Sequence, residues 1–125
     1  MNRRRFVSSL IAAAAAALSA ARAEAAPAPA EQSLIDRLIT YVERQRGMTF
    51  VRNGKEHSCA DAAKFLRGKM EAMGDEVVTA HDFIDRIATR SSTSGDPYHV
   101  KFADGRMVPA STFLRDELKR IESSR

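Results

Sequence analysis

The amino-acid sequence predicts a single small α+β domain over residues 32–125, with about four helices packed on two short antiparallel β-hairpins. Apolar residues recur at helical spacing in four separate segments of the chain. Two dipeptides, Asn53-Gly54 and Asp104-Gly105, are typical of two-residue hairpin turns because their residues tolerate a positive φ angle. Since whole hairpins alternate with helices, we expect the helices to cover one face of an antiparallel sheet.

The first helix and the first hairpin are expected within residues 32–57. A helix over about 32–46 is predicted to end at Gly47, and its apolar face comprises Leu34, Ile35, Leu38, Ile39 and Val42. Strands at 48–52 and 55–57 flank the first turn. Hairpins this short are not stable alone, so the two hairpins are expected to join each other or to lie on the helices.

The second and third helices each begin at a hydroxyl residue that is followed by an aspartate at the capping-box offset. Ser58 is predicted to cap a helix over 59–73 that ends at Gly74. Its buried side chains are expected to be Ala62, Phe65, Leu66, Met70 and Met73. Thr79 is predicted to cap the third helix, whose apolar face is Phe83, Ile84, Ile87 and Ala88.

The C-terminal part of the domain is predicted to contain a loop, the second hairpin and the last helix. Residues 91–97 combine hydroxyl side chains with glycine and proline, which indicates a loop. The segment 98–102 alternates, so Tyr98 begins a strand with one apolar face. Residues 106–108 form the returning strand, and the last helix is marked by Phe113, Leu114, Leu118 and Ile121.

The N-terminal segment is typical of an export signal. Residues 1–25 begin with basic residues, continue with an alanine-rich apolar stretch and end in small residues that fit cleavage after Ala23 or Ala25. Because Arg3-Arg4 resembles the twin-arginine motif, we expect the twin-arginine route, with an ordinary Sec signal or an uncleaved anchor as the alternatives. Residues 26–31 are predicted to be a flexible leader. The expected location is the periplasm or the exterior of the cell.

The net charge of +4 arises entirely from the predicted signal. From Glu24 onward, 16 basic and 16 acidic residues balance, because the other four basic residues are Arg3, Arg4, Arg5 and Arg22. A nucleic-acid-binding protein normally carries a basic stripe, which the balanced part of this chain lacks. We therefore expect no nucleic-acid partner, and we expect no stable membrane insertion.

Four sequence islands resemble a known bacterial family: Phe50-Val51-Arg52-Asn53-Gly54, the helix from Ala62 to Lys69, Thr79-Ala80-x-x-Phe83-Ile84, and Ser91-Ser92-x-Ser94-Gly95-x-Pro97-Tyr98. Together they are similar to the YfeK-like family of small exported proteins, a domain of unknown function. The resemblance covers about residues 32–121, and it implies export and a single fold without implying an activity. Cys59 departs from the family pattern, which argues against a thiol function that the family shares.

The serine loop, residues 91–97, is the most unusual stretch and has two interpretations. The hydroxyls, Gly95 and Pro97 are sufficient to explain a structural turn. Alternatively, three serines beside a tyrosine can hold a carboxylate, a sugar or a peptide backbone. A phosphate is disfavoured because the loop follows the negative end of a helix. The candidate ligand-binding residues are Ser91, Ser92, Ser94, Gly95 and Tyr98, together with Arg52 if the two hairpins share a sheet.

The sequence indicates no catalytic residue, no metal site and no cofactor. The three histidines lack metal-ligand spacing, and no nucleophile elbow surrounds a serine. Cys59 lies near His57 in the sequence, but no third group is placed to orient the histidine. The favoured function is a monomeric exported binding or interaction module for a periplasmic protein, peptide or saccharide. A small cell-envelope hydrolase with a Ser/His or Cys/His site is the first alternative, and a structural partner subunit is the second.

Overall fold

The computed structural model describes residues 27–124. The predicted signal peptide, with both cleavage sites, lies outside the described residues. The described α-helices are α2 (Pro29–Arg44), α3 (Cys59–Met73), α4 (Ala80–Arg86) and α5 (Ala110–Ser123), with a short 3-10 helix at Gly74–Glu76. The strands are β1 (Met48–Arg52), β2 (Lys55–His57), β3 (His99–Phe102) and β4 (Met107–Pro109). Within this part of the chain, no helix is both long enough and apolar enough to cross a membrane.

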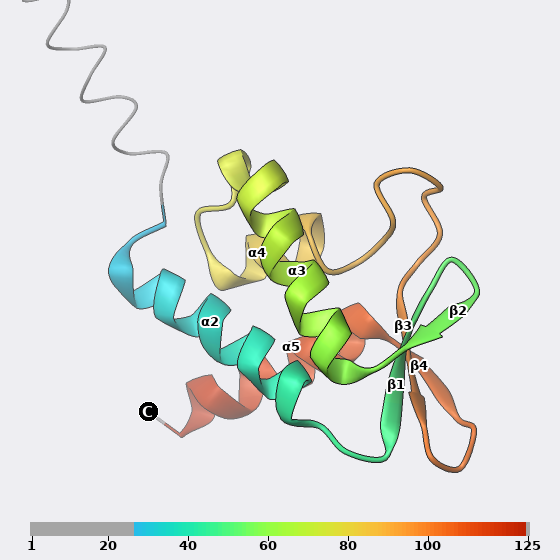
Figure 1. The fold of residues 1–125 in the computed structure, drawn as a ribbon. Helices are drawn as coiled ribbons and strands as arrows, with labels where there is room; N and C mark the ends of the chain where they lie inside the picture. Colours follow the sequence, from blue (N-terminus) through green and yellow to red (C-terminus); the bar gives the residue numbers. More distant parts are fainter. Residues whose placement is uncertain (1–26, 125) are drawn as a thin grey trace, which may run out of the picture.

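The two predicted hairpins join into one antiparallel sheet with the strand order β2-β1-β3-β4. The pairing of β1 with β3 unites them, and Phe50 lies opposite Val100 at its centre. The helices lie to one side of this sheet (Figure 1). The prediction of a small α+β domain is therefore confirmed for the described residues.

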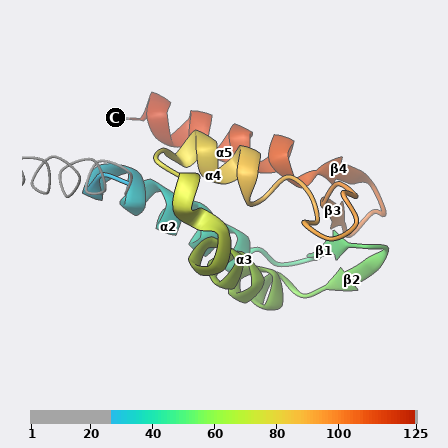
Figure 2. The same ribbon diagram turned by 90° about the horizontal axis from the view of Figure 1, so that it is seen from above.

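A single hydrophobic core fills the space between the sheet and the helices. Phe50 and Val100 are each 2% exposed and contribute the sheet side of this core. The ring of Tyr98 lies between Phe50 and Phe65, with ring centroids 5.6 and 5.8 Å away. Viewed from above, α4 and α5 lie on one side of α2, and α3 lies on the other (Figure 2).

Both ends of the first helix differ from the prediction. The helix α2 begins at Pro29 and ends at Arg44, whereas the sequence predicted about 32–46, so the last three residues of the predicted flexible leader are helical. Proline is favoured at the start of a helix because its missing N–H group would have no intrahelical partner there. Glu31, within this first turn, accepts a hydrogen bond from the backbone N–H of Ala80 at the start of α4 (3.0 Å). The chain leaves the helix at Gln45, which is extended.

The second helix has the predicted bounds, but one predicted core residue is wrong. Met73 is 53% exposed, because it lies on the last turn of α3 just before the 3-10 helix turns the chain away. Phe65 and Met70 are only partly buried. Lys69, by contrast, is buried. The buried face of α3 therefore includes Lys69 and ends at Met70, one turn before the predicted Met73.

The predicted helix caps are present. The Ser58 side chain accepts a hydrogen bond from the backbone N–H of Asp61 (3.1 Å). At α4, Thr79 and Asp82 form the complete capping box, in which each side chain accepts from the backbone of the other. The four predicted apolar residues of this third helix are all buried, although α4 itself ends at Arg86. The strand predicted from Tyr98 begins one residue later, at His99.

Candidate functional site

The serine loop is a closed turn between α4 and β3. An isolated antiparallel bridge joins Arg90 to Pro97 at its base. Inside this bridge, the backbone N–H of Ser91 donates to the carbonyl of Asp96 (2.9 Å), and the N–H of Gly95 donates to the carbonyl of Ser91 (3.0 Å). Gly95 adopts a φ of 78°, which favours glycine. The backbone of the loop is therefore fixed by its own hydrogen bonds.

The Ser91 hydroxyl holds this turn together from within. Ser91 is buried, at 6% exposure. Its oxygen accepts hydrogen bonds from the backbone N–H groups of Thr93 and Ser94, both at 3.3 Å. The hydroxyls of Ser91 and Thr93 also hydrogen-bond to each other (3.0 Å). Ser91 thus has the structural role that the first interpretation of the loop describes.

The turn between β1 and β2 packs against the serine loop through Asn53. The Ser94 hydroxyl donates to the Asn53 side-chain oxygen (2.6 Å), and the Asn53 amide donates to the Ser91 hydroxyl (3.5 Å). Because β1 and β3 are antiparallel neighbours, the end of β1 lies beside the start of β3. The conditional expectation that Arg52 lies near the serine loop is therefore confirmed.

Two cationic side chains lie where the β1–β2 turn meets the serine loop. The Arg52 guanidinium lies over the ring of Phe65, 4.2 Å from its centroid. The Lys69 ammonium donates to the Tyr98 hydroxyl (3.0 Å) and to the backbone carbonyl of Arg90 (2.7 Å). Burial lowers the pKa of Lys69, and the nearby charge of Arg52 lowers it further. Among the described residues, no carboxylate forms an ion pair with either cation.

We call the surface formed by Arg52, Asn53, Ser92, Thr93 and Ser94 the serine corner. Arg52 is half-buried, and the other four residues are exposed. The Ser92 hydroxyl donates to the sulfur of Met73 (3.3 Å). The corner thus offers hydroxyl groups, an amide and the Arg52 guanidinium, and the ammonium of Lys69 is buried behind them.

The structure brings together most of the residues predicted for the site, and it adds others. Tyr98 is buried behind the corner, where its hydroxyl accepts from Lys69. Sequence reasoning missed Lys69, although its place four residues after Phe65 on the buried face of α3 was a usable signal. It also missed Asn53 as a partner of the loop, because turn chemistry alone explained that residue.

Comparison with known proteins identifies the family. Residues 29–122 match the model of a family described as "Family of unknown function (DUF5329)". The chain belongs to this family. It is also 37% identical over 68 residues to the uncharacterized protein YfeK of Salmonella typhimurium. That alignment covers 54% of this chain and 57% of YfeK, so the chain spans little more than half of this relative. No solved structure matches the chain.

Cys59 and His57 are not arranged for the Cys/His form of the hydrolase alternative. Cys59 is 7% exposed, its thiol donates to the carbonyl of Met48 (3.5 Å), and burial raises its pKa. His57 instead lines a cavity of about 230 Å³ with Arg52 and Asp61, and neither a hydroxyl nor a thiol residue lines that cavity. Across residues 27–124, no cluster of three or more His, Cys, Asp or Glu side chains is placed to hold a metal ion.

The second alternative, a structural partner subunit, predicts a large exposed apolar patch. The exposed large apolar side chains of the described DUF5329 residues are Met73, Val78 and Met107. They are distributed over α3, the segment before α4 and β4. These three side chains therefore do not belong to one helix or strand face of the kind that the second alternative predicts.

Proposed function

We propose that this DUF5329 protein is an exported binding module of the periplasm that recognises a carboxylate-bearing ligand, peptide or saccharide, at the serine corner. The observation that carries the proposal is the pair of cations Arg52 and Lys69, which have no carboxylate partner among the described residues. An anion that binds beside them gains charge-assisted hydrogen bonds, which are about twice as strong as neutral ones. Lys69 favours anion binding through its charge, whereas Arg52 is the accessible donor.

The rigidity of the corner supports binding. A loop that is ordered before it meets its ligand loses less conformational entropy on binding. Here the bridge at Arg90 and the hydrogen bonds of Ser91 order the loop, and Asn53 joins it to the sheet. Ser92, Thr93 and Ser94 remain exposed on the ordered backbone.

Binding can be tested by calorimetry on the purified chain without residues 1–25. The probes are a glutamate peptide and a glucuronate oligosaccharide, each compared with its neutral glutamine or glucose counterpart. We expect at least one acidic probe to bind and Arg52→Gln to weaken it by about tenfold, which corresponds to a loss of about 1.4 kcal/mol.

Arg106→Gln is the matched control for this experiment. The Arg106 guanidinium also lies over an aromatic ring, 4.6 Å from the centroid of Phe102, but it belongs to the turn between β3 and β4. Its loss should leave binding unchanged. The proposed site is wrong if neither acidic probe binds, or if both arginine variants weaken binding equally.

Export is tested separately, in cells. The three arginines at positions 3–5 and the alanine-rich stretch that follows them support the proposal that residues 1–25 are a cleaved signal. We expect the tagged protein in the periplasmic fraction with a new N-terminus after Ala23 or Ala25, and we expect Arg3→Lys together with Arg4→Lys to retain it in the cytoplasm. Normal export of this double variant would contradict the twin-arginine route, and an intact N-terminus would contradict cleavage.

A further inference from the structure

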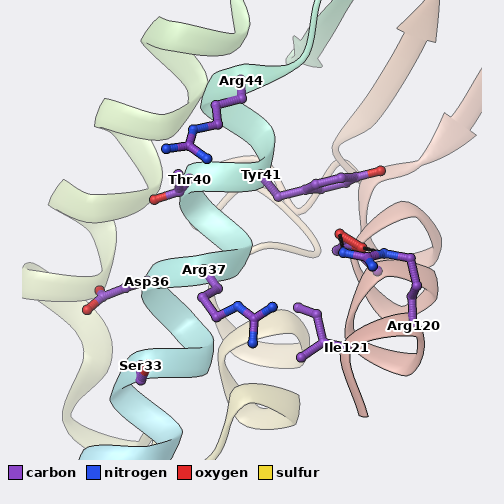
Figure 3. Close-up of a pocket in the computed structure, with 9 residues that line it drawn as sticks. Ser33, Asp36, Arg37, Thr40, Tyr41, Arg44, Arg120 and Ile121 are labelled. Carbon is purple, nitrogen blue, oxygen red and sulfur yellow. Dashed lines mark hydrogen bonds and ion pairs between the residues drawn. The ribbon is translucent and has the colours of Figure 1, made fainter. Parts of the chain in front are cut away.

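A polar concavity lies between α2 and α5, on elements that do not form the serine corner. This groove has a volume of about 440 Å³, and its lining includes Ser33, Arg37, Tyr41, Glu117, Arg120 and Ile121. Figure 3 shows Arg37 and Tyr41 extending from α2 toward α5, where Arg120 and Ile121 lie. Asp36 and Thr40 also line the groove, but they point to the other side of α2.

A buried carboxylate fixes one of the guanidinium groups in this groove. The Glu117 side chain is only 3% exposed, whereas the side chain of Arg120 is 66% exposed. Arg120 donates to both oxygens of Glu117, through Nε and through Nη2. A bidentate pair of this kind restricts the arginine to one orientation, so an exposed side chain that is usually mobile is held in place. Within residues 27–124, Glu117 is the acceptor for the Arg120 side chain, so the remaining N–H groups of Arg120 can bind a ligand.

The opposite wall supplies a second guanidinium and an aromatic surface. No carboxylate in the described part of the chain forms an ion pair with Arg37, which is exposed. The ring of Tyr41 stacks on Phe113, with the ring centroids 5.3 Å apart, and this contact fixes its position. Ile121 is buried and adds an apolar surface beside them.

We propose that this groove binds a small monocarboxylate with an apolar body. The residues that line the groove bring three positive charges, from Arg37, Arg44 and Arg120. Asp36 and Glu117 bring two negative charges, so the groove has one positive charge in excess. A single excess charge matches a monoanion, and the planar guanidinium fork matches a carboxylate. The apolar body of the ligand lies against Tyr41 and Ile121.

The proposal is tested by titrating the ¹⁵N-labelled chain without residues 1–25 and following its amide resonances by NMR at constant ionic strength. The probes are benzoate, neutral benzamide and inorganic phosphate. We expect benzoate to cause saturable shifts on α2 and α5, and we expect benzamide and phosphate to cause none. Arg37→Gln should weaken benzoate binding by about tenfold.

Arg115→Gln is the matched control for Arg37→Gln. Arg115 is an exposed arginine of α5, the other helix of the groove, but it pairs with Asp85 and does not line the groove. This substitution should leave benzoate binding unchanged. Glu117→Gln should broaden the Arg120 Nε–H resonance and weaken benzoate binding, because Arg120 then loses its fixed orientation. If Glu117 only repelled the ligand, that variant would strengthen binding instead.

Three results would overturn the proposal: no saturable shift with benzoate, phosphate binding as tight as benzoate binding, or equal weakening by Arg37→Gln and Arg115→Gln. Arg52→Gln separates this groove from the serine corner. This variant should leave the benzoate shifts on α2 and α5 unchanged, whether or not the serine corner binds a ligand.

Discussion

Lys69 and Cys59 lie on the same helix, and burial changes the acid–base behaviour of both side chains. Desolvation lowers the pKa of Lys69, because burial disfavours its charged form. Its folded-state pKa is therefore below its unfolded value. The unfavourable contribution of this lysine is fully present at pH values below the folded pKa, and it is relieved as the pH rises through that pKa. The lysine nevertheless has two hydrogen-bond acceptors, the Tyr98 hydroxyl and the Arg90 carbonyl.

At the residue scale, Cys59 is predicted to react slowly with a thiol reagent at neutral pH. The thiolate is the reactive form, and burial both raises the thiol pKa and restricts access. We expect the native protein to react at least about tenfold more slowly than the protein unfolded in guanidinium chloride. Because the chain has a single cysteine, the absorbance of the chromophore that the reagent releases reports the reaction of this residue alone. Equal rates in the native and unfolded proteins would contradict the buried position.

At the element scale, α4 shows how short helices depend on their ends. It has only 7 residues, fewer than an isolated helix needs for stability in water. Its capping box supplies acceptors for the first backbone N–H groups, and Glu31 of α2 accepts from the N–H of Ala80. The start of α4 is therefore stabilised both by its own capping box and by a side chain of α2.

Asp82→Asn is predicted to destabilise the protein near neutral pH by about 0.3–1 kcal/mol, the usual contribution of a negative charge in the first turn of a helix. The pKa of Asp82 is lowered chiefly by the hydrogen bond from the backbone N–H of Val78. Its folded pKa is thus below the ordinary value of 3.8, so the stabilisation is present above that value and is lost as the pH falls through the folded pKa. Urea unfolding of both proteins should therefore show a difference that shrinks in strong acid.

The control for this comparison is Asp85→Asn, which removes the exposed ion pair with Arg115. Such surface ion pairs contribute little to stability, so Asp85→Asn should reduce the free energy of unfolding by less than Asp82→Asn does. A difference between wild type and Asp82→Asn that stays constant with pH would show that the charge of Asp82 has no part in the cap.

At the scale of the whole molecule, the helices and the sheet share one core. Residues from α2 to α5 and from the two central strands belong to the same buried cluster. A domain of this kind unfolds as one cooperative unit. A destabilising substitution at one position of the core should therefore lower the free energy of unfolding by the same amount for every spectroscopic probe.

Leu118→Ala is predicted to reduce the free energy of unfolding by about 2–5 kcal/mol, because Leu118 is only 1% exposed and its truncation leaves a cavity. The loss should be the same by far-UV circular dichroism and by the near-UV signal of the tyrosines. Met73→Ala is the control: Met73 is 53% exposed, so its effect should stay within about 0.5 kcal/mol. Different unfolding midpoints by far-UV and near-UV circular dichroism would contradict the single core.

The sequence by itself determined the features that depend on neighbouring residues. The bounds of α3, the turn at Asn53-Gly54 and the capping box of Thr79 and Asp82 all follow from contacts within a few residues, so a local pattern is sufficient to predict them. The balance of charge after the predicted signal also required no structure.

Only the tertiary structure decided which distant segments meet. The pairing of β1 with β3 joined the hairpins, placed Asn53 on the serine loop and positioned Arg52 beside it. The exposure of Met73, the burial of Lys69 and the groove between α2 and α5 likewise depend on how elements pack. Helical periodicity gives the face of a helix, but it does not show where a neighbouring helix or loop stops covering that face.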